Sequence, residues 1–159
     1  MEDLLMKKVI EINDFFDKDG NLLTSLISDT ASSENGGLRS LINLLMETVT
    51  EQVEEQQGRR PPKPKKINEP LKNSQLRKFY DSFIKIYNAQ INEEQKKVQL
   101  LMLKSNAEYS ANRLNIRRFG IFLNNRINIV LNKKGNEFNK YMDALKLHFE
   151  ALVGYFPKN

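Results

Sequence analysis

The chain of 159 residues contains no cysteine and no tryptophan. The absence of cysteine excludes disulfides, thiolate metal ligands and thiol nucleophiles, and it is typical of proteins in a reducing compartment. No apolar run approaches the roughly 20 residues that a membrane span needs, and residues 1–4 are acidic where a secretory signal would be basic. We therefore expect a cytoplasmic protein that is neither secreted nor inserted in a membrane.

Signatures of catalysis are also missing from the sequence. The single histidine, His148, has no cysteine or second histidine with which to share a metal, so packing explains it better than ligation or general-base chemistry. The sequence contains no glycine-rich phosphate loop, no Gly-x-Ser-x-Gly and no His-Glu-x-x-His. We expect a binding or scaffolding protein with no catalytic residue, no metal and no cofactor.

Charge is distributed very unevenly along the chain. Residues 1–57 carry 4 Lys/Arg against 12 Asp/Glu, a net charge of −8, whereas residues 58–159 carry 21 against 8, a net charge of +13. The sign changes at residues 58–66, GRRPPKPKK, where the prolines prevent a helix and the like charges repel one another. Because a basic surface gains affinity for polyanions by releasing their counterions, nucleic acid is the expected partner.

The spacing of apolar residues predicts an all-α fold, a compact antiparallel helical bundle. We divide the chain into an acidic helical segment at 1–57, a basic proline-rich linker at 58–72 and a basic bundle core at 73–159. Helices are expected over residues 4–16 and 38–52, from an N-cap at Ser74 to Tyr87, from Glu93 to Tyr109, and over 116–130 and 138–152. Strand-type alternation is nearly absent, and short breaks between helices favour antiparallel neighbours.

For the helix that starts at Glu93, one stripe of residues predicts which face is buried. We expect that stripe to consist of Val98, Leu101, Met102, Ser105 and Tyr109. Further apolar residues lie off the main stripes of the bundle, namely Leu100, Leu103, Phe122 and Ile129. We expect some of these to contact another subunit, because a bundle this small cannot bury them all.

Arginine and lysine cluster on the predicted bundle helices with few carboxylates beside them. The candidate nucleic-acid-binding residues are Arg77, Lys78, Lys104, Arg113, Arg117, Arg118, Arg126, Lys133 and Lys134. Several asparagines between Asn124 and Asn132 add neutral donors suited to phosphates and ribose hydroxyls. The linker cations, from Arg59 to Lys66, suit either a flexible arm on a nucleic acid or an ordinary solvated linker.

Exposed aromatic residues would indicate base stacking, but the aromatic residues here favour a core. Tyr80, Tyr87 and Phe119 fall clearly on apolar stripes, and Tyr109 does so less clearly. We therefore predict core packing for this group and no base recognition.

Three stretches, in this order, resemble the small subunit of type III-A (Csm-type) CRISPR effector complexes. Residues 71–80 read LKNSQLRKFY, residues 100–113 read LLMLKSNAEYSANR, and residues 146–156 read KLHFEALVGYF. The chain departs from the family at Ser105-Asn106, where Pro-Lys is frequent, and residues 1–57 have no match.

The resemblance implies a non-catalytic subunit that self-associates along the guide RNA, contacts the backbones of guide and target RNA, and joins the other subunits of the complex. By family position it implies RNA contacts for Arg77, Lys104 and Arg113. Base pairing then selects the target, so the protein needs no base-reading side chains. A further hypothesis is that the acidic segment covers the basic face in the free protein.

Two other classes remain open on the residues alone. A helical DNA-binding regulator shares the basic bundle, although no recognition helix is evident, and it would prefer duplex DNA. A protein-only adaptor would use the apolar patches and show no salt-sensitive binding of nucleic acid.

Overall fold

The computed structural model describes residues 6–29, 37–51, 58 and 65–158. Its elements are a π-helical turn η1 (Met6–Ile10), a 3-10 turn η2 (Thr24–Leu26), α2 (Gly37–Met46), β1 (Val49–Thr50), β2 (Lys66–Asn68), α3 (Asn73–Asn88), α4 (Glu93–Leu114), α5 (Arg117–Leu131) and α6 (Asn136–Tyr155). The predicted all-α class is confirmed, with one short antiparallel ribbon in addition. Arg59, Arg60 and Lys63 lie outside the described residues.

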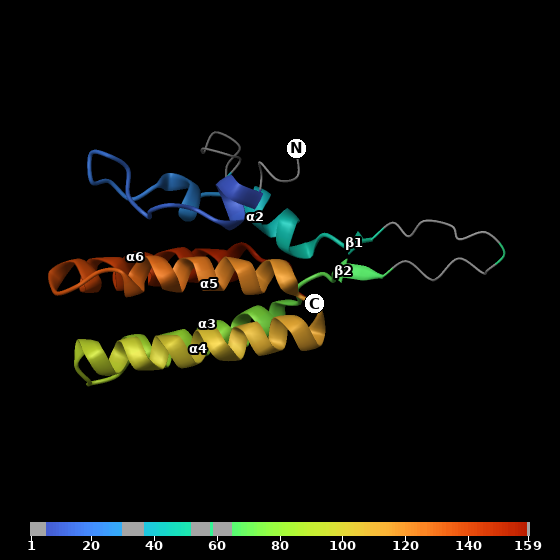
Figure 1. The fold of residues 1–159 in the computed structure, drawn as a ribbon. Helices are drawn as coiled ribbons and strands as arrows, with labels where there is room; N and C mark the ends of the chain where they lie inside the picture. The colour runs from blue at the N-terminus through green and yellow to red at the C-terminus, as the bar shows by residue number, and fades with distance from the viewer. Residues whose placement is uncertain (1–5, 30–36, 52–57, 59–64, 159) are drawn as a thin grey trace.

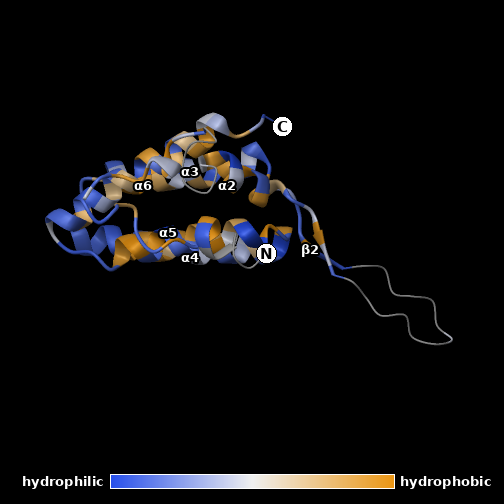
Figure 2. Cartoon of the chain, turned by 90° about the horizontal axis from the view of Figure 1, so that it is seen from above, coloured by the Kyte–Doolittle hydropathy of each residue, from blue (hydrophilic) through white to orange (hydrophobic). Residues whose placement is uncertain are grey.

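The helices α3 to α6 form a bundle, and the N-terminal elements cover one side of it (Figure 1). Each of these helices packs against two others of the four, because α4 and α6 both contact α3 and α5. Aromatic rings fill the interior, with Phe83 stacked on Phe149 at 6.0 Å and Phe79 against Phe119 at 5.2 Å between ring centroids. Figure 2 shows both apolar and polar residues on each bundle helix, as amphipathic helices require.

The predicted stripes of α3, α5 and α6 are confirmed. Their buried residues include Leu76 and Phe83 on α3, Leu123 on α5, and Phe138 and Phe149 on α6. The start of α3 differs from the prediction, because the helix begins at Asn73 and the predicted cap, Ser74, is already inside it. The side-chain oxygen of Gln75 accepts the N–H of Lys72 at 2.9 Å and so satisfies one backbone donor at this end.

The predicted buried stripe of α4 is wrong. The buried residues of this helix are Leu100, Leu103, Ala107 and Ala111, whereas Val98, Leu101, Met102 and Tyr109 are between 50% and 68% exposed. Phe122 and Ile129 are also buried, so the residues expected to be free for a subunit contact belong to the core. Since α4 has apolar residues on opposite faces, periodicity alone could not tell which face packs inward.

The predicted helix over residues 4–16 is also replaced by a different structure. After η1 the chain continues irregularly to a single antiparallel bridge between Phe16 and Leu22. The Asp14 carboxylate accepts the N–H groups of Phe15 at 2.7 Å and Phe16 at 3.2 Å. Such side-chain acceptors compete with the helical hydrogen-bond pattern, which explains why amphipathic spacing did not produce a helix here.

The acidic N-terminal segment packs on α5 and α6. Its apolar residues, including Ile10, Phe15, Leu26 and Leu41, join the same hydrophobic cluster as the bundle residues. The change of charge at the linker therefore does not mark a break in this core. The exposed cations Lys78, Lys85 and Arg113 belong to α3 and α4, so this packing does not support the hypothesis that the acidic segment covers them.

The ribbon pairs Val49 with Asn68 and Thr50 with Lys66, with an irregularity between the two pairs. Asn68 is buried, and its side-chain amide donates to the carbonyl of Glu47 at 2.8 Å. The amide of Asn115, at the turn between α4 and α5, donates to the carbonyl of Lys66 at 2.7 Å. The ribbon is therefore anchored to the bundle at the end where α4 meets α5.

The helices α4 and α5 approach most closely at Gly120. A Cβ atom added there would lie 2.6 Å from the Cβ of Ala111. No real pair of carbon atoms packs at that distance, so the glycine is required by the contact between the helices.

We predict that Gly120→Ala destabilises the protein and that Gly154→Ala does not. The added methyl at Gly120 should lower the free energy of unfolding by about 1–2 kcal/mol, because overpacking outweighs the gain in helix propensity. Gly154 on α6 has nothing within 4 Å of its added Cβ, so its alanine variant provides the control for propensity. Urea unfolding, followed by circular dichroism, measures the stability of both variants. A shift of both midpoints in the same direction would contradict the steric explanation.

Candidate nucleic-acid interface

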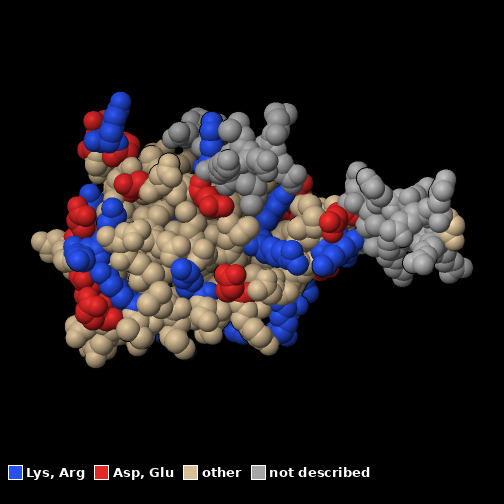
Figure 3. Space-filling view, in the orientation of Figure 1, with Lys and Arg blue, Asp and Glu red and all other residues tan. Residues whose placement is uncertain are grey.

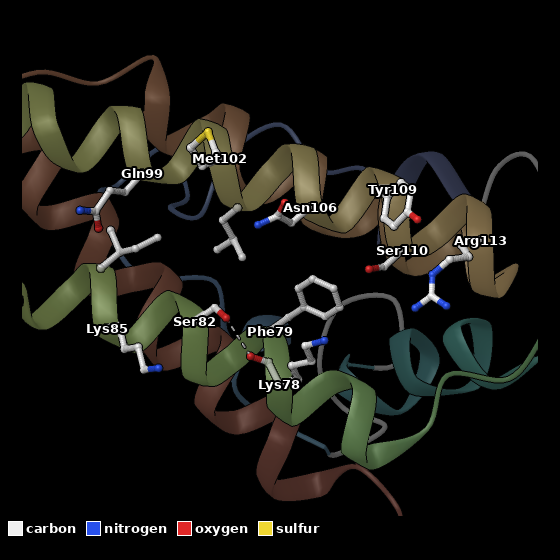
Figure 4. A pocket seen from close by; sticks show the side chains of 12 residues that line it. Lys78, Phe79, Ser82, Lys85, Gln99, Met102, Asn106, Tyr109, Ser110 and Arg113 are labelled. Carbon is white, nitrogen blue, oxygen red and sulfur yellow. Dashed lines mark hydrogen bonds between the residues drawn. The ribbon is translucent and has the colours of Figure 1, made fainter.

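A groove of about 490 Å³ lies between α3 and α4 (Figure 4). We call it the α3–α4 groove. It is lined by Lys78, Phe79, Ser82, Lys85, Ile86, Gln99, Met102, Leu103, Asn106, Tyr109, Ser110 and Arg113. No aspartate or glutamate is among these described lining residues, so the groove combines cations and neutral donors without a carboxylate.

Both walls of the groove contribute positive charge. Lys78 and Lys85 lie seven residues apart on α3, two helical turns, and Arg113 lies near the end of α4. All three side chains are exposed, and within the described residues none of them pairs with a carboxylate. The Arg113 guanidinium instead lies 5.9 Å from the ring centroid of Tyr109. These cations are therefore available to an anionic ligand.

The other exposed candidates are spread over different surfaces. Arg77 is exposed on α3 but does not line the groove, and Arg117 lines a smaller cleft between α4 and α5. Lys104 is half-buried and donates to the Asn128 side-chain oxygen at 2.8 Å, which draws it toward α5. The groove therefore unites Lys78 and Arg113 of the predicted set and adds Lys85, which the sequence analysis did not select.

Lys133 and Lys134 do not extend a surface shared with Arg117. They follow the end of α5, whereas Arg117 begins it, so the length of the helix, about 22 Å, separates them. Lys133 is half-buried with its ammonium 4.6 Å from the ring centroid of Tyr141, and Lys134 is exposed. Lys133 and Lys134 therefore stay separate candidates at the far end of α5.

Arg118 lies in the interior rather than on a nucleic-acid-binding surface. Its side chain is 6% exposed, and Nη1 donates to the carbonyl of Leu44 at 3.0 Å and to the Glu47 carboxylate at 2.7 Å. These bonds join α5 to α2 and the chain that follows it. Since the guanidinium is enclosed and hydrogen-bonded, we leave Arg118 out of the candidate surface.

Arg126 is buried still more completely, at 1% exposure. Its Nη1 donates to the carbonyl of Ile10 at 2.6 Å and its Nη2 to that of Val9 at 3.0 Å, while Nε donates to Nε2 of His148 at 3.1 Å. The guanidinium also lies over the ring of Phe122, 4.5 Å from its centroid. Burial lowers the pKa of Arg126 to about 9. Arg126 therefore binds the N-terminal segment of the protein itself and is not available to a ligand.

The single histidine completes this buried network. Nδ1 of His148 lies 2.7 Å from the carbonyl of Leu26, so that nitrogen carries the proton, and Nε2 accepts from Arg126. Burial, followed by the positive charge of Arg126, lowers the pKa of His148 to about 3. The ring is therefore neutral near pH 7, and the expectation of a packed histidine agrees with its position.

The surface shows where positive charge gathers on one face of the molecule. In Figure 3 Lys and Arg side chains cluster around the base of the ribbon and the adjoining end of the bundle, whereas acidic and basic side chains mix at the opposite end. Arg113 and Arg117 flank the α4–α5 turn that is tied to this ribbon. The ribbon end is thus the more basic end of this face.

The fold and surface define a small all-α bundle with a basic groove. Within the described ranges, no helix is long and apolar enough to cross a membrane, and no group of three or more His, Cys, Asp or Glu residues could hold a metal ion.

The family model described as Csm2 Type III-A matches residues 50–157. The chain therefore belongs to the Csm2 family, the small subunits of type III-A CRISPR effector complexes, and the resemblance seen in the sequence is confirmed. The match begins at the ribbon and covers the whole bundle, while most of the acidic segment precedes it. Comparisons with curated proteins and with solved structures found no match.

We predict that the buried histidine makes stability fall in mild acid. Because the pKa of His148 is about 3 in the folded protein and near 6.5 in the unfolded chain, the unfolded state binds the extra proton. Its contribution to stability is complete above pH 6.5 and is lost as pH falls toward 3. Between pH 6.5 and 5 the free energy of unfolding should drop by about 1–2 kcal/mol.

The matched variant is His148→Gln, whose amide can donate to Leu26 and accept from Arg126 without titrating. Urea unfolding at several pH values should give a flatter profile for this variant in the same window. Equal pH profiles for the two proteins would show that His148 is not the group responsible.

Proposed function

We propose that this Csm2-family subunit holds guide RNA and its RNA target inside the effector complex by contacting their backbones, without catalysing cleavage. The α3–α4 groove, with cations on both walls and no carboxylate among its lining residues, is the observation that carries this proposal. Such a surface attracts a phosphodiester chain, because each neutralised phosphate releases counterions.

The neutral side chains of the groove fit the same ligand. Gln99 and Asn106 contribute amides to the lining of the groove, and Ser82 and Ser110 contribute hydroxyls. Amides and hydroxyls can bond both phosphate oxygens and ribose 2′-hydroxyls, and the 2′-hydroxyl is what distinguishes RNA from DNA. Target choice is left to base pairing between guide and target, so contacts that ignore sequence are sufficient.

Arg77, Arg117 and Lys104 lie outside the groove, on either side of α3 and α4, and supply further backbone contacts in this proposal. Lys134 and Lys133, at the far end of α5, would meet a different part of the RNA or another subunit. Arg118 and Arg126 have no part in it, since both are buried and hydrogen-bonded within the protein.

We also propose that the subunit self-associates through the outer face of α4, which we define as Val98, Leu101 and Met102. These side chains are 59%, 50% and 60% exposed and lie on the side of the helix away from its buried face. Exposed apolar residues grouped in this way are characteristic of protein contacts. Covering them with a second copy of the chain would remove apolar surface from water.

Native affinity purification of the tagged full chain, without nuclease treatment, tests the main proposal. Sequencing the bound nucleic acid and identifying the bound proteins should recover repeat-derived guide RNA together with other subunits of the complex. Recovery of duplex DNA instead would favour a regulator, and recovery of proteins without nucleic acid would favour an adaptor.

We predict that Lys78→Gln and Arg113→Gln each weaken binding of single-stranded RNA several-fold. Each lost phosphate contact should reduce the slope of log affinity against log salt by about 0.7. Fluorescence anisotropy with the full chain and a labelled RNA of mixed sequence measures both quantities. Lys18→Gln removes the same charge from an exposed position in the N-terminal segment and should change neither beyond a small general effect. Equal losses in all three variants would contradict a localised groove site.

We predict that Leu101→Glu reduces self-association, since a carboxylate placed in the outer face of α4 would lose its hydration in the contact. Leu147→Glu is the matched control, because Leu147 on α6 is 48% exposed against 50% for Leu101. Light scattering over a range of concentrations should show a lower average mass for Leu101→Glu alone. An unchanged mass, or the same reduction in the control, would assign the contact elsewhere.

A further inference from the structure

We propose that Tyr109 is a stacking platform for an unpaired base of the RNA strand in the α3–α4 groove, with Arg113 beside it neutralising the adjoining phosphate. This inference rests on the proposed function, because it specifies how the same groove holds its ligand. It assigns a base contact to a subunit whose expected contacts are with phosphate and ribose.

Tyr109 is the most exposed of the large apolar residues in the described chain, at 68%. It lines the groove, and within the described residues its hydroxyl has no hydrogen-bond partner. The buried face of α4 carries Ala107 and Ala111, which flank Tyr109 in sequence, so the helix directs the tyrosine away from the core. An aromatic ring held in solvent on a regular helix presents a face that a ligand can cover.

Arg113 is one helical turn beyond Tyr109 and is itself exposed. Its guanidinium lies 5.9 Å from the tyrosine ring centroid, within the range of a cation–π contact. In the described part of the chain, no carboxylate competes for this charge. A strand that stacks a base on the ring would therefore meet a cation close to the position of its own backbone (Figure 4).

The cations of the groove favour RNA over a protein as the ligand of this site. Lys78, Lys85 and Arg113 would have to be dehydrated beneath an apolar protein surface, which is costly when no carboxylate accompanies them. A nucleic acid strand neutralises the cations and covers the ring at the same time. Of the outer face of α4, Met102 borders the groove, whereas Val98 and Leu101 do not line it, so the two surfaces meet only at Met102.

Stacking also agrees with a subunit that has to accept any guide. Every base presents an aromatic face, so a tyrosine platform contributes affinity without selecting a sequence. Nucleotides that are already unpaired need no unstacking of a duplex and are the preferred class of ligand. The site is thus expected to recognise a single-stranded or extruded nucleotide rather than a continuous duplex.

The test compares two labelled probes on the full chain. One is a mixed-sequence RNA of about 12 nucleotides, and the other is the same ribose-phosphate chain without bases. The wild-type protein should bind the probe with bases about tenfold more tightly or better. Tyr109→Ala should lose that preference while keeping its affinity for the abasic probe and the salt slope, and Tyr109→Phe should retain it.

Tyr155→Ala is the control, because Tyr155 is an exposed tyrosine at the end of α6 and outside the groove. It should leave the preference for bases intact. An unchanged preference in Tyr109→Ala would overturn the inference, and an accompanying fall in self-association would assign the ring to a protein contact. If Lys78→Gln and Arg113→Gln weaken binding while Tyr109→Ala has no effect, the backbone proposal stands without the stacking site. Absence of salt-dependent RNA binding by the wild type would contradict both.

Discussion

Arg126 sits where the N-terminal segment meets the bundle, and its guanidinium bonds to the carbonyls of Val9 and Ile10 and to His148. Those carbonyls lie at the end of the π-helical turn η1 and have to be paired once they are buried. Together with Arg118 and its bonds to Leu44 and Glu47, this residue joins the segment to α5. The two parts of opposite net charge are therefore held mainly by backbone acceptors and apolar packing, and the cations of α3 and α4 remain exposed.

The sequence was sufficient for the helical class and for the buried faces of α3, α5 and α6. It was insufficient for α4, where Leu100 and Leu103 compete with Val98, Leu101 and Met102 for the interior. Which side is buried depends on where α3 and α5 lie, and that is a property of the assembled bundle. For the same reason the exposure of Tyr109 could not be predicted, because a tyrosine on an apolar stripe is usually part of a core.

The candidate site was predictable to a similar extent. Lys78 and Arg113 were selected from charge pattern and family position and do lie in one groove, and Lys85 could have been added from its spacing to Lys78. Arg118 and Arg126 were predicted from charge pattern alone and are buried. The backbone carbonyls that accept from them lie more than 70 residues away in sequence. In a linear sequence such an arginine looks like any other exposed arginine.

The turn at Asn115 ties one wall of the groove, the helix α4, to α5. This residue, in the left-handed conformation with φ 59°, reverses the chain between α4 and α5, and the contact of Gly120 with Ala111 leaves no space between those helices. The helix α4 therefore cannot shift without carrying α5 and the ribbon with it. On the opposite side α3 rests on rings such as Phe149 and Phe119, whose contacts are less restrictive than a glycine packed against an alanine. A change in the width of the groove therefore requires a movement of α3, because α4 is held by its close contact with α5.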